Sequence, residues 1–290
     1  MSPLLIIEQT LNGLQFGVTL FLMAAGLTLV FGVMNLVNLA HGSMFMLGAY
    51  ALVMFERLTG SFVLGLLCAI PATALVGVVI EVLVMRTLYR RDHLDQSLAT
   101  IGLILLLNEG VRIVWGKLPL KAALPAAVSG SVEILPGVAY PVFRLVVIAV
   151  GVLVALAMWW LVTRTRIGML VRAGASDREM IGMLGVDIKK LCTIVFGIGT
   201  ALAGLAGMMA APIIGVQSGM GDNVLILTLV VIVIGGAGSV RGAFIAALAV
   251  GLFDTFGRVL LPPAVASMVI YILMAAVLLW RPQGLFGQHA

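Results

Sequence analysis

Three polar side chains near the start of the chain are the clearest candidates for chemistry inside an otherwise apolar sequence. Asn35, Asn38 and His41 follow one another at a spacing of three in the segment MNLVNLAHGSMFMLGAY. Residues three apart lie on one face of a helix, and polar groups at membrane depth are costly unless they face other helices or water. The spacing predicts a polar helix face that either lines a pathway for a polar molecule or bonds to neighbouring helices.

Few other charged residues fall within apolar runs. Glu109 and Arg112 are three residues apart, and Asp254 and Arg258 are four apart, so each pair is expected to form an ion pair on its own helix. Glu81 lies deeper in its apolar run and is expected to have no local partner. It is therefore a candidate proton or substrate group, or a side chain that extends towards the membrane surface.

The sequence contains no recognisable catalytic arrangement. It has no phosphate-binding P-loop, no HExxH pair and no GxSxG turn, and its three histidines are scattered. We therefore expect a chain that is not an enzyme, has no catalytic residues, holds no metal and binds no cofactor of its own.

Composition and run length predict the fold class. Hydrophobic residues make up 62% of the 290 residues and charged residues only 10%, whereas about a quarter of a soluble domain is charged. The apolar runs are long enough to cross a hydrocarbon core of about 30 Å. We expect an all-α, polytopic membrane bundle of about eight to nine transmembrane helices, with broken or half-helices near His41 and Gly235 as the alternative to full spans. The nine expected segments are 11–33, 34–55, 62–88, 98–115, 140–162, 191–211, 223–234, 243–261 and 265–280.

The segment from Arg164 to Lys190 is the longest charged stretch, with six basic and three acidic residues between two apolar runs. It is too polar to cross a bilayer. Ser176 and Glu179 have the spacing of a helix capping box, and Gly185 is placed to end a helix in the left-handed conformation. The pattern predicts a short, folded helix in water, presented to another molecule.

The expected contact face of this helix is apolar with charges around it. Met180, Ile181 and Leu184 have helical spacing, while Asp177 and Glu179 are placed to fix the register of a partner. We expect these five residues, with Ser176 and Gly185, to form the docking element.

Basic residues indicate how the chain is oriented. With nine crossings, eleven of the seventeen lysines and arginines fall on one side, including Arg86, Arg90, Arg91, Arg241, Arg281 and the six of the 164–190 segment. The positive-inside rule places that side in the cytoplasm. The N-terminus is then outside and the C-terminus inside.

A glycine-rich stretch interrupts the apolar pattern near residue 240. Gly235, Gly236, Gly238 and Gly242 are expected to form a helix break or hinge, because glycine accepts backbone angles that other residues resist. The segment 240–244 also resembles 40–45. Two broken helices in corresponding places would indicate an internal repeat around a transport pathway.

Three motifs together resemble a known family. MNLVNLAHGSMFMLGAY, RAGASDREMIGMLGVDIKKL and GGAGSVRGAFIAALAVGL occur in the order and spacing typical of the Liv-type branched-chain amino acid ABC-transporter permeases, closest to the H-type subunit. The resemblance covers essentially the whole chain, 1–290, as one permease domain in a bacterial inner membrane. It implies a second, M-type permease subunit, two cytoplasmic ATPase subunits that use ATP and Mg, and a periplasmic binding protein. It makes the 164–190 segment a coupling loop. The basic residues fall in loops between spans, so the net charge of +5 is interpreted as a signal of membrane topology and no nucleic-acid partner is expected.

Two alternatives remain open from the residues. Members of similar sequence are associated with urea, short amides or other amino acids, and no charged pair here is obviously placed for an amino acid's ammonium and carboxylate groups. An ion-gradient-driven secondary transporter, with Glu81 or Glu109 as the coupled group, is the alternative from a different class.

Overall fold

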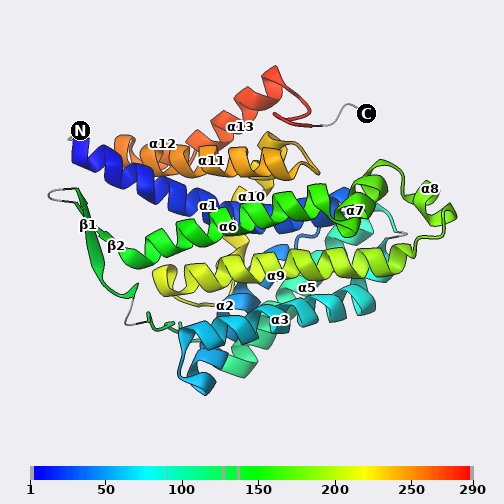
Figure 1. Cartoon of the computed structure of the whole chain (residues 1–290), viewed down its shortest axis with the longest axis horizontal. Helices are drawn as coiled ribbons and strands as arrows, with labels where there is room; N and C mark the ends of the chain where they lie inside the picture. The colour runs from blue at the N-terminus through cyan, green and yellow to red at the C-terminus, as the bar shows by residue number, and fades with distance from the viewer. Residues whose placement is uncertain (1–2, 90, 126–127, 136–137, 288–290) are drawn as a thin grey trace.

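The computed structural model describes residues 3–89, 91–125, 128–135 and 138–287 as an elongated helical bundle (Figure 1). Arg90, one of the basic residues used to orient the chain, lies outside these ranges. Within these ranges six helices, counting α3 with its continuation to Leu88, are long and apolar enough to span a membrane. The long helices are α1 (Pro3–Met34), α3 (Phe62–Ile80), α5 (His93–Trp115), α6 (Val142–Arg164), α9 (Ile188–Ile214) and α11 (Val240–Leu260).

Shorter helices complete the described part of the bundle. Three of them, α2 (His41–Thr59), α10 (Met220–Gly235) and α13 (Val269–Trp280), are the remaining apolar segments expected from the sequence. α3 continues through a π-helical turn, Glu81–Met85, into α4 (Arg86–Leu88). The charged segment forms two helices, α7 (Arg166–Ser176) and α8 (Arg178–Met183), and α12 (Pro263–Ala266) is a single turn.

Helix α1 lies at the centre of the bundle. Nearly all of its residues from Gly17 onwards are buried, and it packs against α9 and α11 most extensively. Small residues make these contacts close: a side chain at Gly26 would overlap the backbone of Gly199, and one at Gly17 would overlap Ala247. Glycine at such positions lets membrane helices approach with their backbones in contact. The abundance of glycine in this sequence therefore has a direct packing role.

Two helices begin inside the bundle instead of at its ends. α2 starts with the His41 ring beside the Met23 carbonyl, well within α1, at an Nε2–O distance of 3.3 Å. α10 starts beside the first turn of α2, where Gly221 lies directly against Gly42. Both helices therefore start within the bundle, and whether each one crosses the whole membrane remains a prediction.

The order of elements is repeated in opposite directions, because α1 starts at the end of the bundle with the β-strands and α9 starts at the end with α8 (Figure 1). In each half a long helix (α1 or α9) is followed by a helix that starts inside the bundle (α2 or α10) and then by another long helix (α3 or α11). The start of α10 at Met220, not the region around Val240, is the counterpart of the start of α2. The repeat proposed from residues 40–45 and 240–244 thus had the wrong register, because residues 236–239 form the turn between α10 and α11.

The two ends of the bundle differ in character. The N-terminus and a hairpin of β1 (Ser131–Leu135) and β2 (Val138–Pro141) lie at one end, and α8 lies at the other (Figure 1). The Tyr140 hydroxyl lies 3.2 Å from Asn12 Oδ1 and fastens the hairpin to α1. The end with α8 also contains the last turn of α1, since Gly174 of α7 lies near Val33.

Candidate coupling site and polar interior

A tight reversal of the chain carries the polypeptide from α6 into the charged segment. Thr165 caps α7 by accepting a hydrogen bond from the Gly168 backbone N–H at 3.1 Å. A side chain at Gly168 would overlap the Leu161 carbonyl oxygen of α6. The absence of a Cβ at Gly168 therefore lets α7 fold back against the end of α6.

Helix α8 is short but has a specific cap at each end. Asp177, not Ser176, is its N-cap, and its Oδ1 accepts from the Met180 N–H at 2.9 Å, while Ser176 is the last residue of α7. The predicted Ser176–Glu179 capping box is therefore wrong: the chain leaves the helical conformation at Asp177, one residue later. At the other end Gly185 has φ +87°, the Val186 N–H bonds to Ile181 O, and the Gly185 N–H bonds to Gly182 O. This is the Schellman arrangement that glycine favours.

The outward face of α8 differs from the predicted contact face. Met180 is 54% exposed, Met183 82% and Leu184 76%. Ile181 is buried, and its Cδ1 lies against Gly174 of α7. Ile181 therefore anchors α8 to the bundle and cannot belong to the exposed face, whereas Met183, which the sequence reasoning omitted, does.

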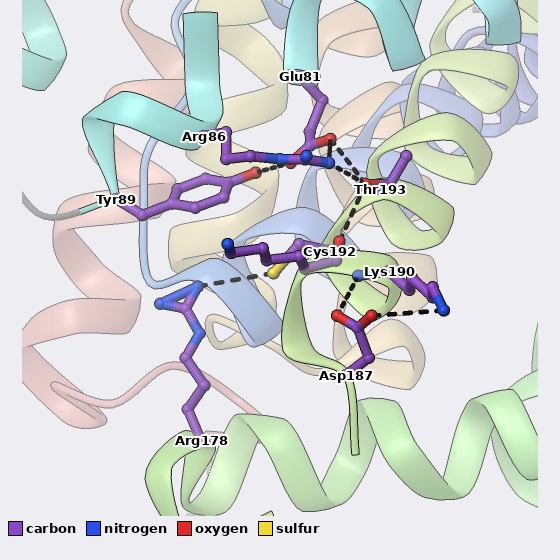
Figure 2. Close-up of polar contacts among 9 residues, drawn as sticks. Glu81, Arg86, Tyr89, Arg178, Asp187, Lys190, Cys192 and Thr193 are labelled. Carbon is purple, nitrogen blue, oxygen red and sulfur yellow. Dashed lines mark hydrogen bonds and ion pairs between the residues drawn. The ribbon is translucent and has the colours of Figure 1, made fainter. Parts of the chain in front are cut away.

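Glu81 is surrounded by partners at the same end of the bundle (Figure 2). Its carboxylate is fully buried and pairs with the Arg86 guanidinium at 3.2 Å. The Tyr89 hydroxyl donates to Oε1 at 3.0 Å, and the Thr193 hydroxyl donates to Oε2 at 2.7 Å. Arg86 also donates to Thr193 Oγ1 at 2.9 Å. The prediction that Glu81 has no local partner was wrong.

The π-helical turn explains why this pairing was not visible in the sequence. Residues five apart do not share a face of an α-helix, but π-helical i to i+5 bonding stacks them. The Arg86 N–H bonds to Glu81 O in this way, and the two side chains meet five residues apart. π turns are frequent at functional sites.

Arg178, the first residue of α8, reaches the same cluster. Its guanidinium lies over the Tyr89 ring, 5.5 Å from the centroid, and its Nη2 is 3.7 Å from Cys192 Sγ. Burial, together with the charge of Glu81, raises the pKa of Tyr89 well above its ordinary range. The phenol therefore remains protonated as a donor to Glu81. Nothing in the local sequence pattern indicated this contact between residues 89 positions apart.

The start of α2 does not have the predicted helical face. α1 ends at Met34 because Asn35 adopts φ +50°, a left-handed conformation that asparagine tolerates. Residues 35–38 belong to no helix or strand, and Asn38 Oδ1 accepts from the Ala40 N–H at 3.0 Å in a local turn. Asn35 is exposed, while Asn38 and His41 are fully buried. The three side chains therefore do not share one helix face.

Several polar atoms around this start have no hydrogen-bond partner in the described structure. They are Asn38 Nδ2, His41 Nδ1 and Ser43 Oγ, and all three are buried. Beside them, the N-terminal ends of α2 and α10 meet at Gly42 and Gly221. Helix N-termini carry partial positive charge, so the centre of the bundle combines two such ends with a group of buried polar side chains.

The two ion pairs expected from helical spacing are present. Arg112 bonds to Glu109 at 2.6 Å, with both side chains substantially exposed, and Arg258 bonds to Asp254 at 2.8 Å. In the glycine-rich stretch α10 ends at Gly235, Gly236 and Gly238 have positive φ, and Ser239 caps α11 by accepting from the Gly242 N–H. A helix break lies at these glycines, and their role as a hinge remains a prediction.

Comparison with known families identifies the bundle. Residues 9–278 match the model of the family described as branched-chain amino acid transport system / permease component. The chain belongs to this family. It is accordingly a multi-pass membrane protein and a transporter permease, as the three sequence motifs indicated.

Individual relatives extend over almost the full chain. The high-affinity branched-chain amino acid transport system permease protein BraD of Pseudomonas aeruginosa is 29% identical, covering 97% of this chain and 96% of its own length. The corresponding LivH of Escherichia coli K12 is 28% identical with the same coverage. A probable LivH of Methanocaldococcus jannaschii is 22% identical over 92% of this chain and 88% of its own. No solved structure matches.

Proposed function

We propose that this chain is the transmembrane permease subunit of an ATP-driven importer for branched-chain amino acids. In this proposal residues 1–290 form one permease domain, and a second, M-type permease subunit completes the pathway. A periplasmic binding protein delivers the substrate. Two cytoplasmic ATPase subunits bind ATP and Mg, and this chain binds no cofactor. Family membership and two near full-length relatives of this kind support the proposal.

The orientation follows from the distribution of charge. Ten of the eleven basic residues counted above are described. Arg86 and Arg178 contact the cluster beside α8, and Gly238, three residues before Arg241, lies near Gly32 in the last turn of α1 at the same end. The positive-inside rule assigns that end to the cytoplasm. We therefore place the N-terminus and the β1–β2 hairpin outside a bacterial inner membrane, and α8 and the C-terminus inside.

The exposed apolar face of α8 carries the proposal of ATPase docking. Met180, Met183 and Leu184 stand out from a helix that is capped at both ends and anchored by Ile181. An amphipathic helix in a groove is a recurring recognition mode, with apolar side chains as anchors and charges setting register. Asp177 and Glu179 are the exposed charges on this helix, and Ser176 and Gly185 delimit it.

The test is leucine uptake by the chain reconstituted with its partner subunits and binding protein. We expect ATP-dependent uptake, and we expect Met183→Asp combined with Leu184→Asp to remove the ATPase subunits on purification and abolish uptake. Truncating two interface anchors typically costs about 2 kcal/mol each, so docking should weaken by more than about a hundredfold. Leu58→Asp is the matched control, because this leucine is 73% exposed at the opposite end. This variant should retain both the bound ATPase subunits and ATP-dependent uptake.

Other results would redirect the assignment. Uptake by the chain alone, driven by a proton or sodium gradient without ATP, would replace the importer with a secondary transporter. ATP-dependent uptake of urea, a short amide or another amino acid in place of leucine would keep the mechanism and change the substrate. An intact complex with normal uptake in the double variant would refute docking through α8.

We also propose that Asn38 and His41 contribute to the substrate pathway, with Asn35 at its entrance. Their support is the set of unpartnered polar atoms at the junction of α2 and α10. These atoms require a water molecule or a polar ligand, because an unpaired buried polar group costs about 1–3 kcal/mol. Asn38→Leu should lower leucine uptake about tenfold while the complex still assembles. Unchanged uptake would leave these residues with a structural role.

A further inference from the structure

Arg178 occupies a position on α8 that sets it apart from its neighbours. Asp177 and Glu179 on either side are exposed, whereas Arg178 is partly buried against the bundle. Figure 2 shows its side chain extending from α8 towards Tyr89 and Cys192. Arg178 is therefore a side chain of α8 that touches a residue of the α3–α4 segment.

The contacts on the two sides of Tyr89 differ in strength. Arg178 is held by an aromatic face and a thiol, both weak partners, and its Nε has no hydrogen-bond partner in the described structure. Glu81, in contrast, is held by Arg86, Tyr89 and Thr193 at distances of 2.7–3.2 Å. Tyr89 thus joins a loosely held side chain on α8 to a firmly held carboxylate inside the bundle.

The Glu81 carboxylate lies between two helices, α3 with its π turn and α9, that continue deep into the bundle. Glu81 belongs to the π turn that extends α3, and Thr193 belongs to α9. Further along the same pair of helices, Gly77 of α3 lies against Thr200 and Thr73 lies against Gly204. A displacement of Glu81 therefore acts at the end of the continuous α3–α9 contact.

We propose that Arg178, Tyr89 and Glu81 form a link that transmits displacement of α8 to the π turn of α3, with Arg178 and Tyr89 as positioning residues. The inference rests on the proposed ATPase docking. When the ATPase moves α8, the guanidinium pushes or draws the Tyr89 ring, and the phenol hydroxyl carries that movement to the carboxylate between α3 and α9. Without the link, the short connection from Leu184 to Asp187 absorbs the movement locally.

The decisive measurement is the number of leucine molecules taken up per ATP hydrolysed by the complete complex in vesicles. Tyr89→Leu and Arg178→Gln should each lower uptake about tenfold, as expected for losing a cation–π contact of about 1.4 kcal/mol. ATP hydrolysis should stay within about twofold of the wild type, because docking through Met183 and Leu184 is intact. The double variant should take up as much leucine per ATP as either single variant, since each substitution alone already breaks the same link.

Conservative variants and a control separate a link from a packing role. Tyr89→Phe keeps the ring beneath Arg178 but loses the hydroxyl bond to Glu81. Its uptake per ATP hydrolysed should therefore lie between the values for the wild type and Tyr89→Leu. Arg178→Lys keeps the charge over the ring and should recover most of the uptake. Arg91→Gln, at an exposed pair with Asp95 on the same end, should leave uptake and hydrolysis unchanged. If Tyr89→Leu fails to assemble, Tyr89→Phe and Arg178→Lys decide the question.

Three outcomes would overturn the link. Uptake and ATP hydrolysis falling in equal proportion would indicate a docking defect, and unchanged uptake in both Tyr89→Leu and Arg178→Gln would show that the contact transmits nothing. Additive losses in the double variant would show that the two residues act separately. A wild-type complex without ATP-dependent uptake would instead refute the proposed function, which distinguishes that failure from failure of the link alone.

Discussion

Arg86→Met should lower the free energy of unfolding by about 3 kcal/mol, the usual cost of removing one partner from a buried ion pair. The variant leaves the Glu81 carboxylate fully buried, with the Tyr89 and Thr193 hydroxyls as its remaining donors among the described residues. Arg86 itself is about one-third exposed, so the expected loss is at the lower end of the measured range. Thermal unfolding of the purified chain in detergent measures the effect.

A paired variant and an exposed pair provide the controls. Replacing both Glu81 and Arg86 with Met removes the unbalanced charge and should recover most of the lost stability. Arg112→Met breaks the exposed Glu109–Arg112 pair and should cost less than about 1 kcal/mol. Equal losses from Arg86→Met and Arg112→Met would contradict the view that burial makes the Glu81 pair important.

The spanning helices could be predicted because their signal is local. An apolar run of about 20 residues is readable wherever it occurs, and hydrophobic length decides whether a helix can cross a bilayer. The expected segments 62–88 and 140–162 correspond to α3 with its continuation and to α6. The depth at which a helix begins is not local. The 19 residues of α2 have almost the length of a full span, and tertiary contacts such as that between His41 and Met23 place their start inside the bundle.

Predictions that depended on helical periodicity failed where the chain leaves the α-helix. The spacing of Asn35, Asn38 and His41 would place them on one face if the helix continued, but Asn35 ends it with a positive φ. The Glu81–Arg86 pair was missed for the converse reason, since the π turn brings together residues that an α-helix separates. In both places the departure from regular geometry creates the polar arrangement of interest.

The contact face of α8 shows a third limit. Periodicity grouped Met180, Ile181 and Leu184 correctly as neighbours on a short helix, but it contains no information on which way the helix is turned. The packing of Ile181 against Gly174 of α7 sets that rotation and turns Met183 outwards. Gly174 has no side chain, and this leaves room for Ile181 to pack against α7.

Gly221→Ala should be among the most damaging single-methyl changes in the chain. The added Cβ would overlap the Gly42 carbonyl oxygen, and a Cβ on Gly42 would reach the Gly221 oxygen at 2.7 Å. Neither contact can be relieved by a side-chain rotation, because backbone faces backbone on both sides. We expect a loss of about 3 kcal/mol in the free energy of unfolding, at the upper end for overpacking, and loss of leucine uptake.

Gly102→Ala is the matched control, because a Cβ at Gly102 of α5 meets nothing within 4 Å. Alanine favours the helix over glycine by up to about 1 kcal/mol, so this variant should be as stable as the wild type or slightly more stable. The comparison separates the close approach of α2 and α10 from a general effect of glycine in membrane helices. If Gly221→Ala and Gly102→Ala unfold at the same temperature, the packing of α2 on α10 does not depend on backbone contact, and the junction beside Asn38 and His41 has room to open.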